Sequence, residues 1–378
     1  MIVGLNLLYL LPGVVGGTET YAAGLIHGLS QIDEDARFMV YCNHESAEWP
    51  LPADPRFSRV VCPVRATSRS ARYWFEQRTL PALIRSDRID VLHSLGYVAP
   101  LALPCPSVVT VPDVHFLAHG RPADWPRRLL LRFFVRESIA RAAAVIAISG
   151  FTRDALVRTY HLPPDAVDVV LLAAKPRAES RRRDPEILGK AGIARPYLMA
   201  FGGVTPNKNI DRLMRAYRMA RARYGVEQDL VLVGRLPTGW ISEPTPRVIT
   251  PGYLPDDEVA ALLRNAVAFV FPSVYEGFGL PVLEAMAAGV SVACSRIAAI
   301  PEVAGDAALY FDPLDVEDIA RQMARLCTEE STRNELATRG RVRAARFSWE
   351  ETARRTSAIY RRVVAAALTP RTPARVLG

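Results

Sequence analysis

The chain has 378 residues, of which 50% are hydrophobic, and this is enough for two domains that each bury a core. Its 47 Lys and Arg residues outnumber its 39 Asp and Glu residues, and the resulting charge of +8 indicates an acidic partner such as a diphosphate or an anionic membrane surface. Neither a zinc-finger spacing nor an aromatic RNA-binding signature is present, so we expect no nucleic-acid partner.

The cysteines are scattered along the chain, without a C-x-x-C pair or a His-paired metal spacing. They are typical of small buried side chains in a reducing compartment. The first residues resemble a strand rather than a signal peptide, and no apolar run reaches the length of about 18 residues that would indicate a membrane span. The expected location is therefore the cytoplasm.

Short apolar runs alternate with helical stretches in the first half of the chain, which predicts an α/β domain with a parallel sheet covered by helices. Helices are expected at about 20–30, 71–86 and 126–137. The expected strands are residues 3–9, 37–42, 59–64, 91–93, 107–111, 144–148 and 167–172.

A glycine-rich turn with Gly16 and Gly17 separates the first predicted strand from the first predicted helix. This position favours a contact with a phosphate, although an ordinary tight turn would use the same residues. A dinucleotide-binding fold is the competing interpretation, and the absence of the G-x-G-x-x-G spacing weakens it.

Two further loops follow predicted strands in this half. Asp113 and His115 come after the strand at 107–111, and a loop at a strand end can present either side chain to a ligand. A loop histidine satisfied by its neighbours is the alternative. Ser149 opens a helix and is predicted to serve as its N-cap; its segment also resembles one that lines the ligand cleft in the family described below.

Basic and aromatic side chains alternate in two stretches of the same half, at 126–137 and at 65–75. Such a pattern fits docking on an anionic leaflet, with Arg near the phosphates and Leu, Phe and Trp in the interface. It fits equally a core helix with a solvated arginine face. Peripheral attachment at the inner face of the membrane is therefore an expectation.

A charged, Pro-marked stretch at 173–194 separates the two predicted domains. We expect an N-terminal domain at 1–172, a linker at 173–194 and a C-terminal domain at 195–346. A helix at 347–368 and a loose tail at 369–378 complete the chain.

Lys208 follows two glycines and stands beside a predicted helix N-terminus, where it could neutralise a diphosphate. A solvated loop lysine is the alternative. Arg235, which follows the next predicted strand, could add a second positive charge.

The stretch from residue 272 to 289 is the most informative part of the chain. It predicts the end of a buried strand, a loop with Glu276, and a helix that contains Glu284 and ends at Gly289. A strand, a glycine turn and a helix N-terminus together suit a phosphate. The two carboxylates could contact a sugar ring and ribose hydroxyls, or they could be ordinary surface glutamates.

This stretch resembles the E-x7-E signature of the retaining glycosyltransferases of family 4, in the GT-B superfamily. Residues 299–308 also resemble the family segment "lPEvvGdaA". The resemblance implies two Rossmann-like domains that face each other across a cleft, with the acceptor on the first and the nucleotide sugar on the second. It also implies a C-terminal helix that crosses back to the first domain.

The resemblance implies roles for individual residues. Glu276 would contact the donor sugar and help stabilise the cationic transition state, as Asp113 would contact that sugar from the other domain. Lys208, Gly16 and Gly17 would approach the diphosphate, and Glu284 would hold the ribose. The remaining donor-binding residues would be Tyr253, Leu254, Gly277, Phe278, Gly279, Leu280, Val282 and Leu283.

Two positions depart from the family pattern. Asn207 stands where an Arg usually precedes the lysine, and Pro112 stands where a His usually precedes the aspartate. The first change removes a positive charge from the donor site. The second leaves His115 as the candidate replacement.

The resulting prediction is a retaining hexosyltransferase that uses a nucleoside diphosphate sugar, with GDP-mannose as the first choice. The acceptor would be a glycan or a lipid-linked glycan in the synthesis of a cell-surface polysaccharide or glycolipid. No cofactor is expected, and no metal, because no Asp-x-Asp motif offers a divalent site. The alternatives are a sugar-nucleotide hydrolase or epimerase on the same fold, and a nucleotide-binding protein without activity.

Overall fold

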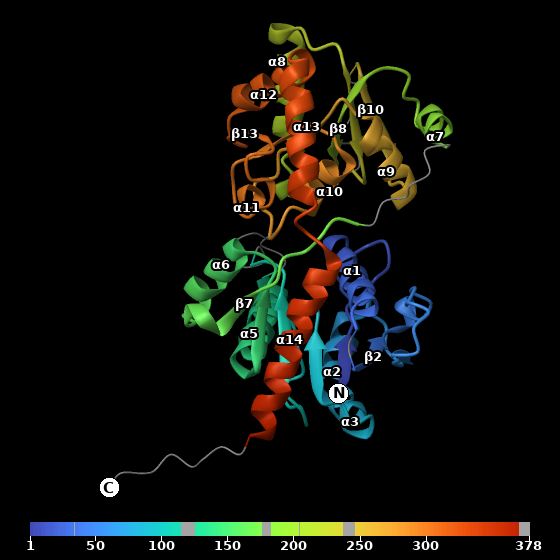
Figure 1. Ribbon diagram of the computed structural model, residues 1–378, viewed down its shortest axis with the longest axis vertical. Helices are drawn as coiled ribbons and strands as arrows, with labels where there is room; N and C mark the ends of the chain where they lie inside the picture. The colour runs from blue at the N-terminus through green and yellow to red at the C-terminus, as the bar shows by residue number, and fades with distance from the viewer. Residues whose placement is uncertain (34, 115–124, 176–182, 204, 237–245, 370–378) are drawn as a thin grey trace. The chain divides into compact units, whose positions relative to one another are not determined.

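The computed structural model describes residues 1–33, 35–114, 125–175, 183–203, 205–236 and 246–369. Within it the chain divides into two compact units (Figure 1). The first unit contains residues 1–172 together with the C-terminal segment from Ser348, and the second contains residues 173–347.

The first unit contains a seven-stranded parallel sheet in the order β3-β2-β1-β4-β5-β6-β7. Its central strands are buried on both faces, which is why they are continuous apolar runs in the sequence. The chain builds the sheet outward from β1 in one direction and returns to continue from β4 in the other. The strands are β1 (Ile2–Asn6), β2 (Arg37–Cys42), β3 (Phe57–Val61), β4 (Val91–Ser94), β5 (Ser107–Val111), β6 (Ala144–Ala147) and β7 (Val167–Val169).

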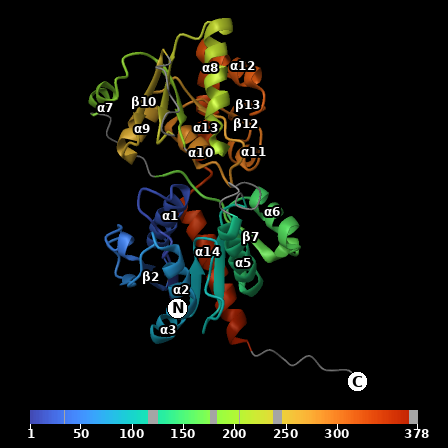
Figure 2. The same cartoon turned by 180° about the vertical axis from the view of Figure 1, so that it is seen from behind.

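The helices of the first unit cover this sheet (Figures 1 and 2). The helix predicted at 71–86 is two helices, because Pro81 starts a new first turn immediately after Thr79 ends the previous helix. The helices are α1 (Gly17–Gln31), η1 (His44–Ser46), α2 (Arg69–Arg78), α3 (Leu80–Ser86), α5 (Trp125–Arg141), α6 (Gly150–Tyr160), η3 (Pro164–Ala166) and α14 (Trp349–Leu368).

The C-terminal helix α14 packs closely against α1. A Cβ atom at Gly24 would lie 2.1 Å from the Trp349 ring, and one at Gly28 would lie 2.1 Å from the Trp349 carbonyl oxygen. The missing side chains of these two glycines therefore provide the space that the first turn of α14 occupies. The helix begins at Ser348, whose hydroxyl accepts a hydrogen bond from the Glu351 N–H.

A chain of buried polar groups extends this contact into the sheet. His93 Nδ1 lies 2.6 Å from the Tyr360 hydroxyl, and His93 Nε2 lies 2.8 Å from Thr110 Oγ1, which in turn contacts the Tyr21 hydroxyl at 2.9 Å. Burial lowers the pKa of His93 to about 3, so the imidazole is neutral. These groups connect α14, β4, β5 and α1 in one network.

The second unit contains a six-stranded parallel sheet in the order β10-β9-β8-β11-β12-β13. The strands are β8 (Tyr197–Phe201), β9 (Asp229–Val233), β10 (Val248–Gly252), β11 (Ala268–Phe271), β12 (Val292–Ser295) and β13 (Leu309–Phe311). The helices are α7 (Asp184–Lys190), η4 (Pro206–Lys208), α8 (Ile210–Tyr224), α9 (Asp256–Asn265), α10 (Leu280–Ala288), α11 (Ile300–Ala304), α12 (Val316–Thr328) and α13 (Glu330–Ala344).

The stretch 173–194, predicted as a linker, contains the helix α7. Its Asp184 is buried and accepts hydrogen bonds from Arg264 Nε at 2.7 Å and from Asn265 Nδ2 at 2.8 Å. These two donors belong to α9, so the second part of the stretch is held on the second unit. None of the helices that the structure describes is long and apolar enough to cross a membrane.

Candidate active site

The loops that carry the predicted donor residues meet at one point of the second sheet. β8 and β11 are neighbours, but the chain leaves β8 toward β9 and leaves β11 toward β12. The loops after these two strands therefore diverge at their carboxyl ends, which is where ligands bind in open parallel sheets. Lys208 lies in the first of these loops and Glu276 lies in the second.

Hydrogen bonds hold the two loops together. The Val274 N–H donates to the Asn207 carbonyl oxygen at 2.8 Å, and Asn207 Nδ2 donates to the Tyr275 carbonyl oxygen at 3.3 Å. Asn209 is buried with a φ of 57°, and its Nδ2 donates to the carbonyl oxygens of Pro272 and Pro313. Asn207 thus joins the two loops through both its backbone and its side-chain amide.

Lys208 and Glu276 form an ion pair between these loops. Lys208 Nζ lies 2.7 Å from Glu276 Oε1, and the two side chains are 25% and 16% exposed. The same ammonium lies 5.3 Å from the centre of the Phe271 ring. The structure therefore brings together the two charged residues that the sequence predicted for the diphosphate and the donor sugar.

The start of α10 supplies backbone donors next to this pair. Gly279 has a φ of 106°, which favours glycine, and it precedes the first turn of the helix. The N–H groups of Val282 and Leu283 already donate to the Gly279 carbonyl oxygen, and both side chains are fully buried. Among the described residues, the N–H groups of Phe278, Gly279 and Leu280 have no acceptor, which leaves them available to an anion.

Glu284 lies in the second turn of α10 and is half-buried. Burial raises its pKa to about 7, the charge of Asp256 acts in the same direction, and the charge of Lys175 lowers it. Lys175 itself lies 2.8 Å from Asp256. A carboxylate kept in this environment suits hydrogen bonds from the hydroxyls of a ribose, the role predicted for it.

Arg235 and Tyr253 lie at the carboxyl ends of β9 and β10. The Arg235 guanidinium lies 5.5 Å from the centre of the Tyr253 ring, and that ring is 58% exposed. The adjacent Leu254 is half-buried. Their predicted contacts with the donor remain predictions.

The glycine-rich turn of the first unit lies at the carboxyl end of β1. Gly16 has a φ of 58°, which side chains disfavour, and Gly17 is the first residue of α1. The Glu19 carboxylate closes the turn by accepting hydrogen bonds from the Gly13 N–H at 2.8 Å and from Trp49 Nε1 at 3.2 Å. These hydrogen bonds define the geometry of the turn.

Asp113 follows β5 and is oriented by a tyrosine. The Tyr97 hydroxyl donates to Asp113 Oδ2 at 2.7 Å, and Tyr97 itself has a φ of 62°. The candidate His115 lies outside the described residues, so its role stays a prediction. Tyr97 was not recognised from the sequence, because its partner lies sixteen positions away in the loop that follows β5.

Ser149 is fully buried and caps α6. Its hydroxyl accepts a hydrogen bond from the Thr152 N–H at 3.0 Å, which confirms the predicted N-cap. This structural role accounts for the serine at the start of the helix.

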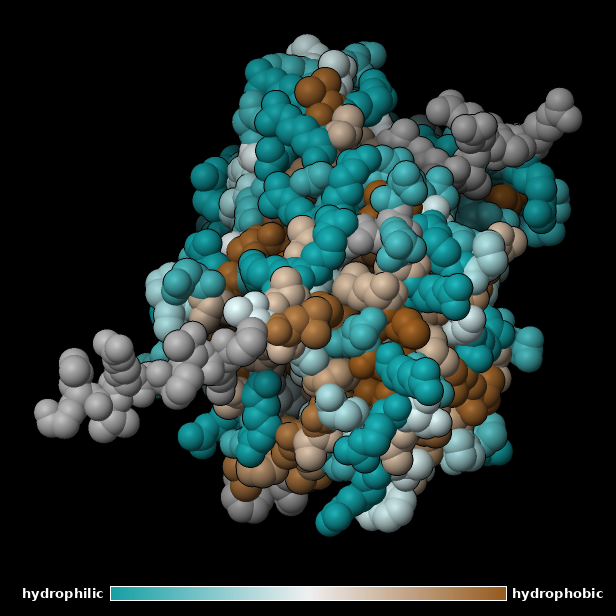
Figure 3. All heavy atoms as spheres, turned by 60° about the horizontal axis from the view of Figure 1, so that its bottom comes forward, coloured by the Kyte–Doolittle hydropathy of each residue, from teal (hydrophilic) through white to brown (hydrophobic). Residues whose placement is uncertain are grey.

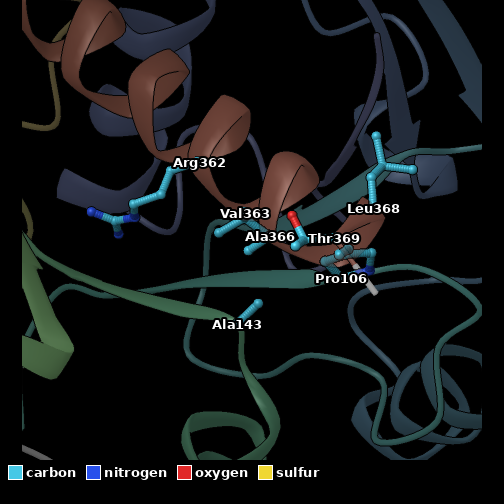
Figure 4. Close-up of a pocket in the computed structure, with 8 residues that line it drawn as sticks. Pro106, Ala143, Arg362, Val363, Ala366, Leu368 and Thr369 are labelled. Carbon is cyan, nitrogen blue, oxygen red and sulfur yellow. The ribbon is translucent and has the colours of Figure 1, made fainter. Parts of the chain in front are cut away.

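Figure 4 shows a pocket at the amino ends of strands β5 and β6 of the first sheet. It is lined by Pro106 and Ala143, which directly precede β5 and β6, and by the last turns of α14. The predicted phosphate-binding turn follows the carboxyl end of β1, so this pocket is no part of the predicted donor site. No group of His, Cys, Asp and Glu that could hold a metal ion is found within the described residues.

Comparison with known proteins identifies the family. A family model for Glycosyltransferase Family 4 matches residues 15–173, and one for Glycosyl transferases group 1 matches residues 195–329. The O-antigen chain mannosyltransferase B of Escherichia coli is 32% identical over 270 residues, which are 68% of this chain and 68% of that protein. The chain belongs to glycosyltransferase family 4.

Other proteins are similar to this chain in sequence or in fold. The alpha-maltose-1-phosphate synthase of Mycolicibacterium smegmatis is 30% identical over 309 residues, which are 71% of this chain and 76% of that protein. The sucrose-phosphate synthase of Thermosynechococcus elongatus matches in structure with a TM-score of 0.76 at 18% identity, covering 97% of this chain and 100% of the other. The predicted GT-B fold of this glycosyltransferase is confirmed.

The glycosyltransferase should lose turnover when Glu276 is replaced by Gln, by about 100-fold or more, since this removes the charge that we predict to stabilise the transition state. Because Glu276 pairs with Lys208, the same change frees the ammonium, and affinity for a nucleoside diphosphate should stay equal or rise up to about fivefold. Isothermal titration and single-turnover rates measure both quantities.

The reciprocal change, Lys208→Ala, should weaken nucleotide binding, whereas Lys190→Ala, at an exposed lysine of α7, should not. Near-normal turnover in Glu276→Gln would remove the predicted role of this carboxylate. Unchanged nucleotide affinity in Lys208→Ala would remove the lysine from the donor site.

Glu284 should make the ligand-free glycosyltransferase less stable at neutral than at acidic pH. Its pKa is raised from 4.5 to about 7, so the carboxyl group loses stability relative to the unfolded chain as the pH rises between these values. The contribution of Glu284 to the free energy of unfolding should therefore differ between acidic and neutral pH by at most about 3 kcal/mol. Glu284→Gln should therefore raise the free energy of unfolding at pH 8 and leave it almost unchanged at pH 4.

Urea unfolding at both pH values tests this expectation, with Glu227→Gln, at an exposed glutamate of the second unit, as the control. An equal effect of Glu284→Gln at pH 4 and pH 8 would contradict the proposed burial cost.

Proposed function

We propose that this glycosyltransferase transfers mannose from GDP-mannose, with retention at the anomeric carbon, to a hydroxyl of a glycan or lipid-linked glycan. The proposed pathway is the synthesis of a cell-surface polysaccharide or glycolipid. The choice of mannose is supported by the name of the Escherichia coli relative, an O-antigen chain mannosyltransferase.

The observation that carries the proposal is the Lys208–Glu276 pair beside the start of α10. The donor diphosphate would replace Glu276 as the ion-pair partner of Lys208. It would also accept hydrogen bonds from the N–H groups of Phe278, Gly279 and Leu280. Glu276, released from the lysine, would then face the donor sugar. Positive charge that develops at the sugar and negative charge that develops on the leaving diphosphate would both be stabilised by groups already in place.

Glu284 and Arg235 would complete the donor site. The Glu284 carboxylate would accept hydrogen bonds from the ribose hydroxyls, and Arg235 with Tyr253 would lie near the nucleotide. In this proposal the lysine and the helix N-terminus neutralise the diphosphate without a metal ion. Neither a metal nor another cofactor is part of the proposed reaction.

The donor should be identified through the stabilisation that a bound nucleotide confers. The synthase from Mycolicibacterium smegmatis, similar at 30% identity, is named for a different sugar product, so the donor needs its own test. We expect GDP at millimolar concentration to raise the melting temperature more than UDP, ADP or dTDP, with or without EDTA. Transfer of radiolabelled mannose to an extracted glycolipid fraction would then confirm the donor.

A larger shift with UDP or ADP would discard GDP-mannose, and a shift that EDTA abolishes would discard the metal-free site. Lys208→Ala serves as the control variant, because it should reduce the shift with whichever nucleotide binds.

We also propose that the enzyme attaches peripherally to an anionic membrane through α2 and α5. The Tyr73 and Phe134 rings stack at 5.2 Å and so hold the two helices side by side. Figure 3 shows apolar side chains at the surface between hydrophilic ones. The α2–α5 surface is defined by the exposed residues Arg69, Trp74, Leu129, Leu130, Phe133 and Arg136.

The composition of this surface supports that proposal. Trp74 is 66% and Phe133 is 52% exposed, a high value for large apolar side chains, and arginines flank both. Apolar rings with neighbouring arginines suit the boundary between lipid phosphates and acyl chains.

Sedimentation with phosphatidylglycerol vesicles at low salt should carry the protein into the pellet, and vesicles of phosphatidylcholine alone should not. Trp74→Ala combined with Phe133→Ala should reduce the bound fraction by about tenfold. Leu314→Ala, at an exposed apolar residue of the second unit, is the control. Absence of wild-type binding to the anionic vesicles would discard the proposal.

A further inference from the structure

The first sheet has a switch point of its own, between β1 and β4. The chain leaves β1 toward β2 and leaves β4 toward β5, so the loops after these neighbouring strands diverge at their carboxyl ends. Asn6 is the last residue of β1 and Ser94 is the last residue of β4. Both side chains are polar and buried, and they lie at the carboxyl ends of the strands, where ligands bind in open parallel sheets.

A buried carboxylate from α2 reaches this position. Glu76 is 3% exposed, and its Oε1 accepts a hydrogen bond from Asn6 Nδ2 at 3.3 Å. Asn6 Nδ2 also lies within hydrogen-bonding distance of Ser94 Oγ at 3.3 Å. The other carboxylate oxygen, Glu76 Oε2, is buried and has no hydrogen-bond partner. Burial raises the pKa of Glu76, and the charge of Arg72 opposes that rise.

Arg72, one helical turn before Glu76, also has a buried polar atom without a hydrogen bond. Its side chain is only 13% exposed, and its Nε lies 3.9 Å from Glu76 Oε2, which is too far for a hydrogen bond. Its Nε is buried and forms this ion pair without any hydrogen bond. The guanidinium also lies 4.8 Å from the centre of the Tyr73 ring, which limits its freedom to turn away.

A buried ion pair in which neither Arg72 Nε nor Glu76 Oε2 has a hydrogen bond leaves a donor and an acceptor that a third group could satisfy. A hydroxyl fits, because it accepts a hydrogen bond from the arginine and donates one to the carboxylate. A phosphate fits less well, because Glu76 would repel its negative charge. The opposite charges of Arg72 and Glu76 thus favour a neutral, hydroxyl-bearing ligand.

We propose that Arg72 and Glu76 form a subsite for a saccharide hydroxyl, which positions the acceptor glycan in the first unit. Arg72 donates a hydrogen bond to the hydroxyl oxygen, and the hydroxyl group donates a hydrogen bond to Glu76 Oε2. Asn6 holds the other carboxylate oxygen and thereby fixes the direction of the free one. The assignment to the acceptor rests on the glycosyltransferase function proposed above, whereas the hydroxyl chemistry rests on these contacts alone.

Saturation-transfer difference NMR with methyl α-mannopyranoside as a millimolar probe tests the subsite. The wild-type protein should give a signal, and Arg72→Gln should weaken binding by about tenfold or more, since a hydrogen bond to a charged group is lost. Glu76→Gln, which preserves the size of the side chain, should have a similar effect. Arg78→Gln, at an exposed arginine of the same helix, should leave the signal unchanged.

Two further measurements show which site the probe occupies. Glu276→Gln should keep the signal, because Glu276 lies in the second unit, and inorganic phosphate should not displace the probe. The subsite is overturned if the wild type gives no signal, if Arg72→Gln and Glu76→Gln both bind like the wild type, if Glu276→Gln removes the signal, or if phosphate competes.

Stabilisation by a nucleoside diphosphate, measured on each variant, shows that the protein is folded and keeps the two proposals apart. Nucleotide stabilisation without an effect of Arg72 or Glu76 on the probe overturns the subsite alone. An effect on the probe without stabilisation of the wild type by any nucleotide overturns the donor proposal and leaves the hydroxyl site standing.

Discussion

The ion pair between Lys208 and Glu276 is the interaction on which the donor site depends. It joins the loops after β8 and β11 at the point where the chain departs in opposite directions from neighbouring strands. Each of the two charges neutralises the other, so neither is an isolated charge in a partly buried position. A diphosphate is a stronger partner for the ammonium than one carboxylate, which means that donor binding and the release of Glu276 are one event in the proposed mechanism.

Helix α2 connects two of the proposals. Arg72 and Glu76 are four residues apart and therefore lie on one face of the helix, toward the carboxyl ends of β1 and β4. Tyr73, on another face, stacks on α5 and contributes to the contact behind the α2–α5 surface. In these proposals, an acceptor that combines a saccharide with a lipid would place its saccharide at Arg72 and Glu76 and its lipid at the α2–α5 surface.

Several features of each unit cost stability, and all of them belong to residues for which we predict or propose a binding role. Glu284 is kept in surroundings that disfavour its charge, and Glu76 and Arg72 each bury a polar atom without a hydrogen bond. Tyr97 holds a left-handed backbone conformation while it orients Asp113. The network from Tyr360 through His93 to Thr110 has the opposite character, since its groups are paired and its histidine is neutral, and it holds the C-terminal helix in place.

The local pattern of the sequence determined the α/β class, the strands and the Glu276–Glu284 motif, because strand periodicity, glycine turns and helix caps act between residues close in the chain. The helix inside the predicted linker was missed, since Asp184 is held by α9, about eighty positions later. Likewise, only the tertiary structure decided that Lys208 pairs with Glu276 and that Arg72 and Glu76 face the ends of β1 and β4. Those contacts depend on strand order, and neighbouring strands of a parallel sheet are distant in sequence, so no local pattern encodes them.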